Sequence, residues 1–240
     1  MRVRKLSVLA LWCLALPVFA AEEEEEKPDP LSGNIKFGFL STTGNTDTTS
    51  LNSSADASYK TGRWQHDAHL AALEASENEQ TTAESYEARW TSGWNLTDKD
   101  FLFGRLNWRK DRFGGFDTQF SQTLGYGRKV VATDVHKLDL ALGAGARQSE
   151  DQNGVRESAT IVTGGLDYKW QFSETAEFTQ TLALEVGDDN TFSESVTAVK
   201  TTLIGAFGLV LSYTVRNNSD VPAGTEKTDT RTSISLQYDF

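Results

Sequence analysis

Cysteine is almost absent from this 240-residue chain, and the one that occurs, Cys13, lies within the first twenty residues. Those residues carry three basic side chains ahead of an apolar run at 6–16 and end on Ala20. This layout predicts a secretory signal peptide at residues 1–20. The bulky Trp12 before Cys13 disfavours a lipoprotein signal. Once the signal is removed, neither disulfides nor thiol chemistry remain.

Long apolar runs are missing too. Beyond residue 20, no segment approaches the roughly 18 consecutive apolar residues that indicate a membrane-spanning helix. This excludes a helical membrane protein. A β-barrel is still allowed, because each spanning strand needs only about 9–11 residues and half of them face the lumen.

Basic residues are outnumbered by acidic ones, 23 to 34, which gives a net charge of −11. Nucleic acid is therefore not expected as a partner, since phosphate binding needs clustered Lys and Arg. Residues 21–32 form an acidic stretch with two prolines and little apolar content. We interpret this segment as a disordered periplasmic lead-in, with a docking tail as the alternative. Residues 33–240 are expected to form one domain.

Apolar and polar residues alternate with a period of two from residue 33 onward, which predicts strands with one apolar face. In the last strand, Ile234, Leu236, Tyr238 and Phe240 share a face opposite Arg231. The expected strands are 33–41, 47–60, 63–75, 82–96, 100–112, 117–132, 136–148, 156–172, 175–187, 190–202, 206–217 and 227–240.

A soluble β-barrel would also alternate, but about twelve strands enclose a lumen too wide for side chains to fill. We therefore predict an all-β fold in which the apolar face points outward. It is a transmembrane antiparallel up-and-down β-barrel with apolar residues toward lipid. Short connections such as 60–63 and 133–136 alternate with longer polar ones such as 111–117 and 217–226, as in outer-membrane barrels. An even strand number would put both termini on the periplasmic side. Aromatic residues near the short turns are expected to form an interfacial girdle: Tyr59, Trp64, Trp94, Trp170, Tyr238 and Phe240.

The charged side chains of the opposite face are the candidate functional residues, since they would line the lumen. They support two hypotheses that the sequence leaves open. One is a selectivity-setting ladder in a narrow pore, in which Arg89, Arg105 and Arg109 face carboxylates. The other is a salt-bridged plug that closes the barrel. The candidates are Glu87, Arg89, Arg105, Arg109, Asp139, Arg147, Asp167, Glu185 and Arg231.

Histidine is scarce, with only three in the chain. His66 and His69 are three residues apart on one expected strand, so they point to opposite faces and cannot share a metal ion. His66 shares the lipid-facing side of Trp64, and no nucleophile, zinc or nucleotide motif appears. We expect no metal, no cofactor and no catalytic residue. A hydrolase would need a nucleophile beside His69.

Several segments together resemble one known family. They are Gly33–Gly38, Thr43–Asp47, Gly125–Arg128, Lys227–Thr230 and Leu236–Phe240. Their order and spacing are similar to those of the salt-induced outer-membrane protein family, a domain of unknown function found in Gram-negative bacteria. The resemblance covers essentially the whole chain after the signal. It implies a single outer-membrane barrel and brings no catalytic residues.

The sequence thus predicts an outer-membrane β-barrel that acts as a narrow passive channel or as an envelope component under osmotic or salt stress. A structural or adhesive barrel with a plugged lumen is the main alternative, and an outer-membrane hydrolase is a further one. The expected partners are outer-membrane lipid and the barrel assembly machinery, which would recognise Tyr238 and Phe240. The protein is expected to be a monomer.

Overall fold

The computed structural model describes residues 29–42, 48–78, 80–221 and 226–240. The expected signal peptide and residues 21–28 of the expected lead-in lie outside the described residues. Strands make up most of the described chain. They are β1 (Leu31–Thr42), β2 (Thr48–Thr61), β3 (Trp64–Glu77), β4 (Gln80–Asn95), β5 (Asp100–Asp111), β6 (Phe116–Ala132), β7 (His136–Asp151), β8 (Arg156–Gln171), β9 (Ala176–Gly187), β10 (Thr191–Ile204), β11 (Phe207–Asn218) and β12 (Thr228–Asp239).

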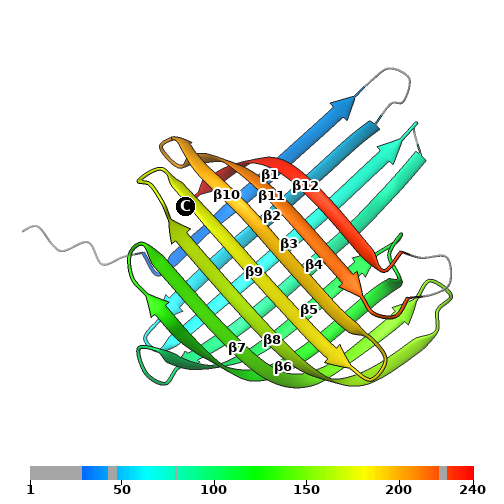
Figure 1. Cartoon of the computed structure of the whole chain (residues 1–240), viewed down its shortest axis with the longest axis horizontal. Coiled ribbons are helices and arrows are strands. Elements are labelled where there is room, and N and C mark those ends of the chain that lie inside the picture. The colour runs from blue at the N-terminus through cyan, green and yellow to red at the C-terminus, as the bar shows by residue number, and fades with distance from the viewer. Residues whose placement is uncertain (1–28, 43–47, 79, 222–225) are drawn as a thin grey trace, which may run out of the picture.

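These strands form one closed barrel (Figure 1). Each strand pairs with its neighbours in the sequence, and β1 pairs with β12 to close the ring. The β1–β12 pairing is antiparallel, as are the others. The predicted all-β, up-and-down barrel of about twelve strands is confirmed. None of the described residues forms a helix long and apolar enough to cross a membrane.

The strand bounds agree with the expected ones to within three residues. The start of β1 changes the expected limit between the lead-in and the barrel domain. β1 begins at Leu31, inside the expected lead-in of residues 21–32. Leu31 lies opposite Tyr59 of β2, and the backbone N–H of Lys60 donates to the carbonyl of Pro30. Pairing with β2 therefore extends the strand past the point where the alternation begins.

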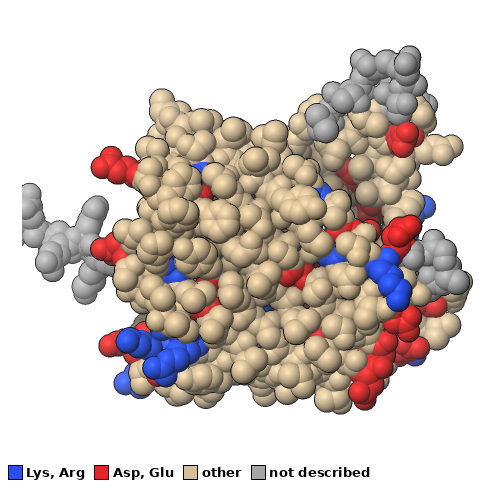
Figure 2. Space-filling model, viewed as in Figure 1, with Lys and Arg blue, Asp and Glu red and all other residues tan. Residues whose placement is uncertain are grey.

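The outer wall of the barrel is apolar. Leu124, Leu142 and Ile234 expose 76%, 70% and 62% of their surface, far more than such side chains expose in a water-soluble fold. Figure 2 shows a wall largely free of charge, with charged groups gathered toward its two ends. Exposed apolar surface on this scale marks a membrane-facing protein.

Aromatic side chains gather at the short-turn end, as the sequence predicts. The rings of Trp64 and Trp94 meet edge to face with centroids 4.7 Å apart, and His66 stacks between Trp64 and Trp90. His66 therefore lies on the outer face, as expected. Gly62 supplies a positive φ of 56° in the turn between β2 and β3, a conformation that other residues adopt with strain.

Glycines on the inner wall make room for two phenylalanine rings. A Cβ at Gly125 would lie 2.5 Å from the Phe103 ring, and a Cβ at Gly127 would overlap the Phe101 ring. Phe103 is only 5% exposed as a result. Gly125 and Gly127 thus allow the phenylalanine rings of β5 to lie flat against β6.

The closing seam between β1 and β12 is short and ends at the last residue of the chain. Four residue pairs connect the strands, from Asn34 opposite Asp239 to Phe37 opposite Leu236. The backbone N–H of Gly33 donates to the Phe240 carbonyl at 2.8 Å, and the N–H of Phe240 donates to the Gly33 carbonyl at 2.9 Å. Phe240 therefore contributes two of the hydrogen bonds that close the barrel.

Deletion of Phe240 should lower the yield of folded barrel. The backbone groups of Gly33 would lose their partners, and a buried unpaired polar group costs about 1–3 kcal/mol. Refolding into lipid vesicles, followed by the heat-modifiable shift in gel mobility, measures this yield. Phe240→Leu is the matched control, because it retains both backbone groups. A deletion variant that refolds as well as the control would contradict this role of Phe240.

Candidate functional site

The candidate site is the charged interior of the barrel. Side chains alternate between the two faces of each strand, so residues opposite to the lipid-facing set point inward. All nine charged residues singled out in the sequence lie on the inward face of their strands. Five of the nine candidates form salt bridges, and four form none among the described residues. The five are Glu87, Arg89, Arg109, Arg147 and Glu185, and the four are Arg105, Asp139, Asp167 and Arg231.

Two cavities occupy the lumen, one toward each end. The cavity on the side of the longer loops has a volume of about 340 Å³, and the one toward the short turns has about 450 Å³. Glu87 lines the first and Arg89 the second, whereas Asp56 and His69 line both. These inward side chains of β2, β3 and β4 therefore lie at the boundary between the two cavities.

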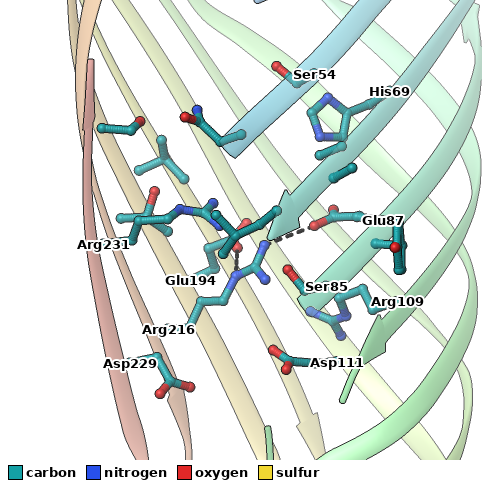
Figure 3. Close-up of a pocket in the computed structure, with 18 of the residues that line it drawn as sticks. Ser54, His69, Ser85, Glu87, Arg109, Asp111, Glu194, Arg216, Asp229 and Arg231 are labelled. Carbon is teal, nitrogen blue, oxygen red and sulfur yellow. Dashed lines mark hydrogen bonds and ion pairs between the residues drawn. The ribbon is translucent and has the colours of Figure 1, made fainter. Parts of the chain in front are cut away.

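A salt-bridge network crosses the loop-side cavity (Figure 3). Arg216 of β11 reaches across to Glu87 of β4, with Nη2 2.9 Å from Oε2, and also pairs with Glu194 on the adjacent strand β10. Glu87 in turn pairs with Arg89 on its own strand at 2.5 Å. The Glu87 side chain is 7% exposed. Two acids and two arginines thus form a chain of ion pairs across the lumen.

A second network lies between β5, β7 and β9. Arg109 Nη2 lies 3.3 Å from Glu185 Oε2, and Arg147 approaches the same carboxylate at 3.6 Å. Arg147 also pairs with Asp189 at 2.7 Å and donates to the carbonyl of Asn190 at 2.7 Å. Its side chain is fully buried. Arg147 therefore links β7 to the end of β9 and to the turn that follows it.

The predicted basic ladder is only partly formed. Arg105 donates to the Thr91 hydroxyl at 3.3 Å and lies over the Phe103 ring, with no acid in salt-bridge range among the described residues. Asp139 and Asp167 lie opposite each other on β7 and β8. The three arginines of β4 and β5 thus do not share one row of carboxylates, because Arg89 and Arg109 turn to different acids.

His69 lies in a separate group with Asp56 and Lys36. Its Nδ1 is 2.6 Å from Asp56 Oδ1, and Lys36 Nζ is 3.2 Å from the other oxygen of the same carboxylate. Within the described ranges, no group of three His, Cys, Asp or Glu side chains could hold a metal ion.

The sequence reasoning missed Arg216, Glu194 and Asp189. Arg216 follows the lipid-facing Val215, so its inward position could have been deduced from the alternation. Glu194 was harder to find, because Ser193, Ser195 and Thr197 give β10 no apolar stripe on the outer face in this region. Asp189 lies in a turn, where no alternation applies.

A family model described as "Protein of unknown function, DUF481" matches residues 35–240 of this chain. The chain belongs to this family. An Escherichia coli K12 relative, described as an uncharacterized protein, YdiY, is 32% identical over 212 residues, which cover 87% of this chain and 83% of the relative. The resemblance to a family of unknown function is thus confirmed, and its link with salt stays a prediction.

Solved structures with this fold include outer-membrane channels. The NanC porin has a TM-score of 0.52 at 10% identity, covering 87% of this chain and 98% of the porin. An outer-membrane channel from Pseudomonas putida F1 has a TM-score of 0.54 at 11% identity, covering 91% of this chain and 98% of the channel. At such low identity the likeness shows that this DUF481 protein has the fold of outer-membrane barrels.

Arg147→Ala should destabilise the barrel strongly. Removal of one partner from a buried ion pair costs about 3–5 kcal/mol, because Glu185 and Asp189 would keep buried charge without Arg147. Arg156→Ala is the control, since Arg156 is 81% exposed in its pair with Glu150 and exposed pairs contribute about 0–1 kcal/mol. Denaturant unfolding in detergent micelles measures both changes. Equal effects of the two substitutions would contradict a structural role for Arg147.

Proposed function

We propose that this protein is a narrow outer-membrane channel for small polar or ionic solutes, with its constriction at the bridge between Glu87 and Arg216. The observation that carries the proposal is a charged lumen that holds two cavities, with the bridge between Glu87 and Arg216 crossing the loop-side one. Charged rings and hydrogen-bonding groups in a pore set which ions and solutes pass. The channel names of two proteins with the same fold agree with this function.

The bridge is suited to opening because both of its ends have a second partner. When Arg216 leaves Glu87, it keeps its ion pair with Glu194 on the neighbouring strand. Glu87 likewise keeps Arg89. Neither charge would be left unpaired in the lumen, which is the condition that makes breaking a buried pair costly. This feature favours a channel over a permanent plug.

We also propose a location, an oligomeric state and an assembly route for this channel. The protein would lie in the outer membrane as a monomer, with both termini in the periplasm and lipid against its apolar wall. The barrel assembly machinery would recognise the last strand with Tyr238 and Phe240. A role in osmotic or salt stress rests on the family resemblance alone.

We propose no catalytic activity. A hydrolase would need a nucleophile in hydrogen-bond reach of His69, and the partner found for His69 among the described residues is the Asp56 carboxylate. The plugged barrel remains the competing function, since it uses the same salt bridges.

Neutralising either end of the bridge should enlarge the conductance, with opposite effects on selectivity. Arg216→Gln removes a positive charge from the lumen and should shift selectivity toward cations, whereas Glu87→Gln should shift it toward anions. Both variants remove the same ion pair, so both should conduct more than the wild type. Single-channel recording of the refolded protein in planar bilayers, with a salt gradient for selectivity, measures both quantities. Arg105→Ala tests in the same way whether the lumen arginine without an acid partner contributes to selectivity.

Arg112→Gln is the matched control, because Arg112 forms its pair with Glu84 at the surface and is 63% exposed. It should leave conductance and selectivity close to those of the wild type. Absence of current from all folded and inserted variants would support the plugged barrel instead. Selectivity shifts of the same sign in Arg216→Gln and Glu87→Gln would contradict the assigned constriction.

A further inference from the structure

The seam between β1 and β12 is paired over only part of its length. Gly38–Thr42 of β1 pair with β2 alone, and Thr228–Ser235 of β12 pair with β11 alone. Gly38 still packs against the carbonyl of Ile234, and the Asn52 side chain of β2 donates to the Ser235 hydroxyl at 3.1 Å. The seam between β11 and β12, in contrast, has eleven residue pairs. Figure 1 shows the ends of β1 and β2 projecting away from β12 on the side of the longer loops. Beyond the contact of Gly38 with Ile234 and Ser235, both strands therefore present unpaired backbone edges to the same opening.

This opening lies at the margin of the apolar wall. On β12, Ile234 is the last exposed apolar residue of the outer face, and Thr232 and Thr230 follow it toward the loops. On β1, Phe39 is 61% exposed on the outer face. Unpaired backbone is costly in hydrocarbon but can be hydrated where lipid head groups meet water. The position of the opening thus matches the head-group level of a membrane.

An arginine lies just inside the opening. Arg231 of β12 lines the loop-side cavity, and Figure 3 shows its side chain extending into the lumen. Among the described residues it makes no hydrogen bond and no ion pair, whereas the charge of Arg216 is shared by Glu87 and Glu194. The hydroxyl groups of Ser212 and Ser233 lie on the same wall of the cavity, 2.7 Å from each other.

We propose that the opening between β1 and β12 admits a membrane amphiphile with an anionic head group. The head group binds Arg231 inside the loop-side cavity, and the acyl chain stays in the lipid beside Phe39 and Ile234. Charge complementarity selects the anionic head group, and the apolar residues that flank the opening select the chain. This binding requires no ion current through the lumen. A test that refutes the channel would therefore leave the lipid-binding proposal unaffected, and the reverse is also true.

The open seam can be tested by distance. Continued in its register, β1 would place Ser41 opposite Thr232, so nitroxide labels on Ser41→Cys and Thr232→Cys report on the seam. The control pair is Tyr213→Cys and Thr232→Cys, because these residues are direct partners between β11 and β12. In lipid nanodiscs, the seam pair should give a longer distance than the control pair. Equal distances would mean that the seam is closed by pairing and would overturn the proposal.

The ligand can be tested by native mass spectrometry of the mature chain in neutral detergent. Lauroyl lysophosphatidylglycerol is the anionic probe, and monolauroylglycerol has the same chain without the phosphate. The wild type should bind the anionic probe more tightly, and Arg231→Gln should weaken that binding about tenfold, as expected for loss of a charge-assisted hydrogen bond. Arg231→Lys should restore most of it, and the surface control Arg112→Gln should have no effect.

Equal binding of the two probes by the wild type would overturn the proposal. So would equal binding of the anionic probe by Arg231→Gln and Arg112→Gln. Heat-modifiable gel mobility establishes beforehand that each variant is folded.

Discussion

The structure depends on one constraint, which is that backbone polar groups within a lipid layer must be paired inside the protein. A sheet meets this constraint by closing on itself, and the chain does so with twelve antiparallel strands. Closure divides every strand into an outer and an inner face, so the alternation of residues becomes a division between lipid and lumen. The apolar exterior, the charged interior and the pairing of the last residue with Gly33 all follow from this single requirement.

The interior must then satisfy its own charges. Two networks of ion pairs do this, one among β4, β10 and β11 and one among β5, β7 and β9. Gly125 and Gly127 of β6 leave space for the rings of Phe103 and Phe101. The interior is therefore filled by ion pairs and by aromatic rings that lie against the wall.

Alternation made most of the fold predictable, because a period of two assigns each residue to a face without knowledge of its neighbours. It placed His66 among the outer tryptophans and Arg109 in the lumen. It could not identify the partner of an inward side chain. Glu87 meets Arg216, 129 residues away in the sequence, only because of the tilt and stagger of the closed barrel. The length of the β1–β12 seam could not be predicted from the sequence for the same reason, since it depends on how the two ends of the sheet meet.

The ion pairs of the lumen fall into two physical kinds. Arg147 is fully buried and holds two carboxylates and a backbone carbonyl near the end of β9, so its loss would leave several groups unsatisfied. Arg216 is 23% exposed to the cavity and shares its charge between an acid on the neighbouring strand and an acid across the lumen. The difference lies in exposure, because Arg216 can leave Glu87 for the cavity while it keeps Glu194, whereas the Arg147 side chain has no exposed surface. A lumen held by pairs of the first kind would be a plug, and the presence of the second kind across the loop-side cavity is the physical reason to propose that this barrel is a channel.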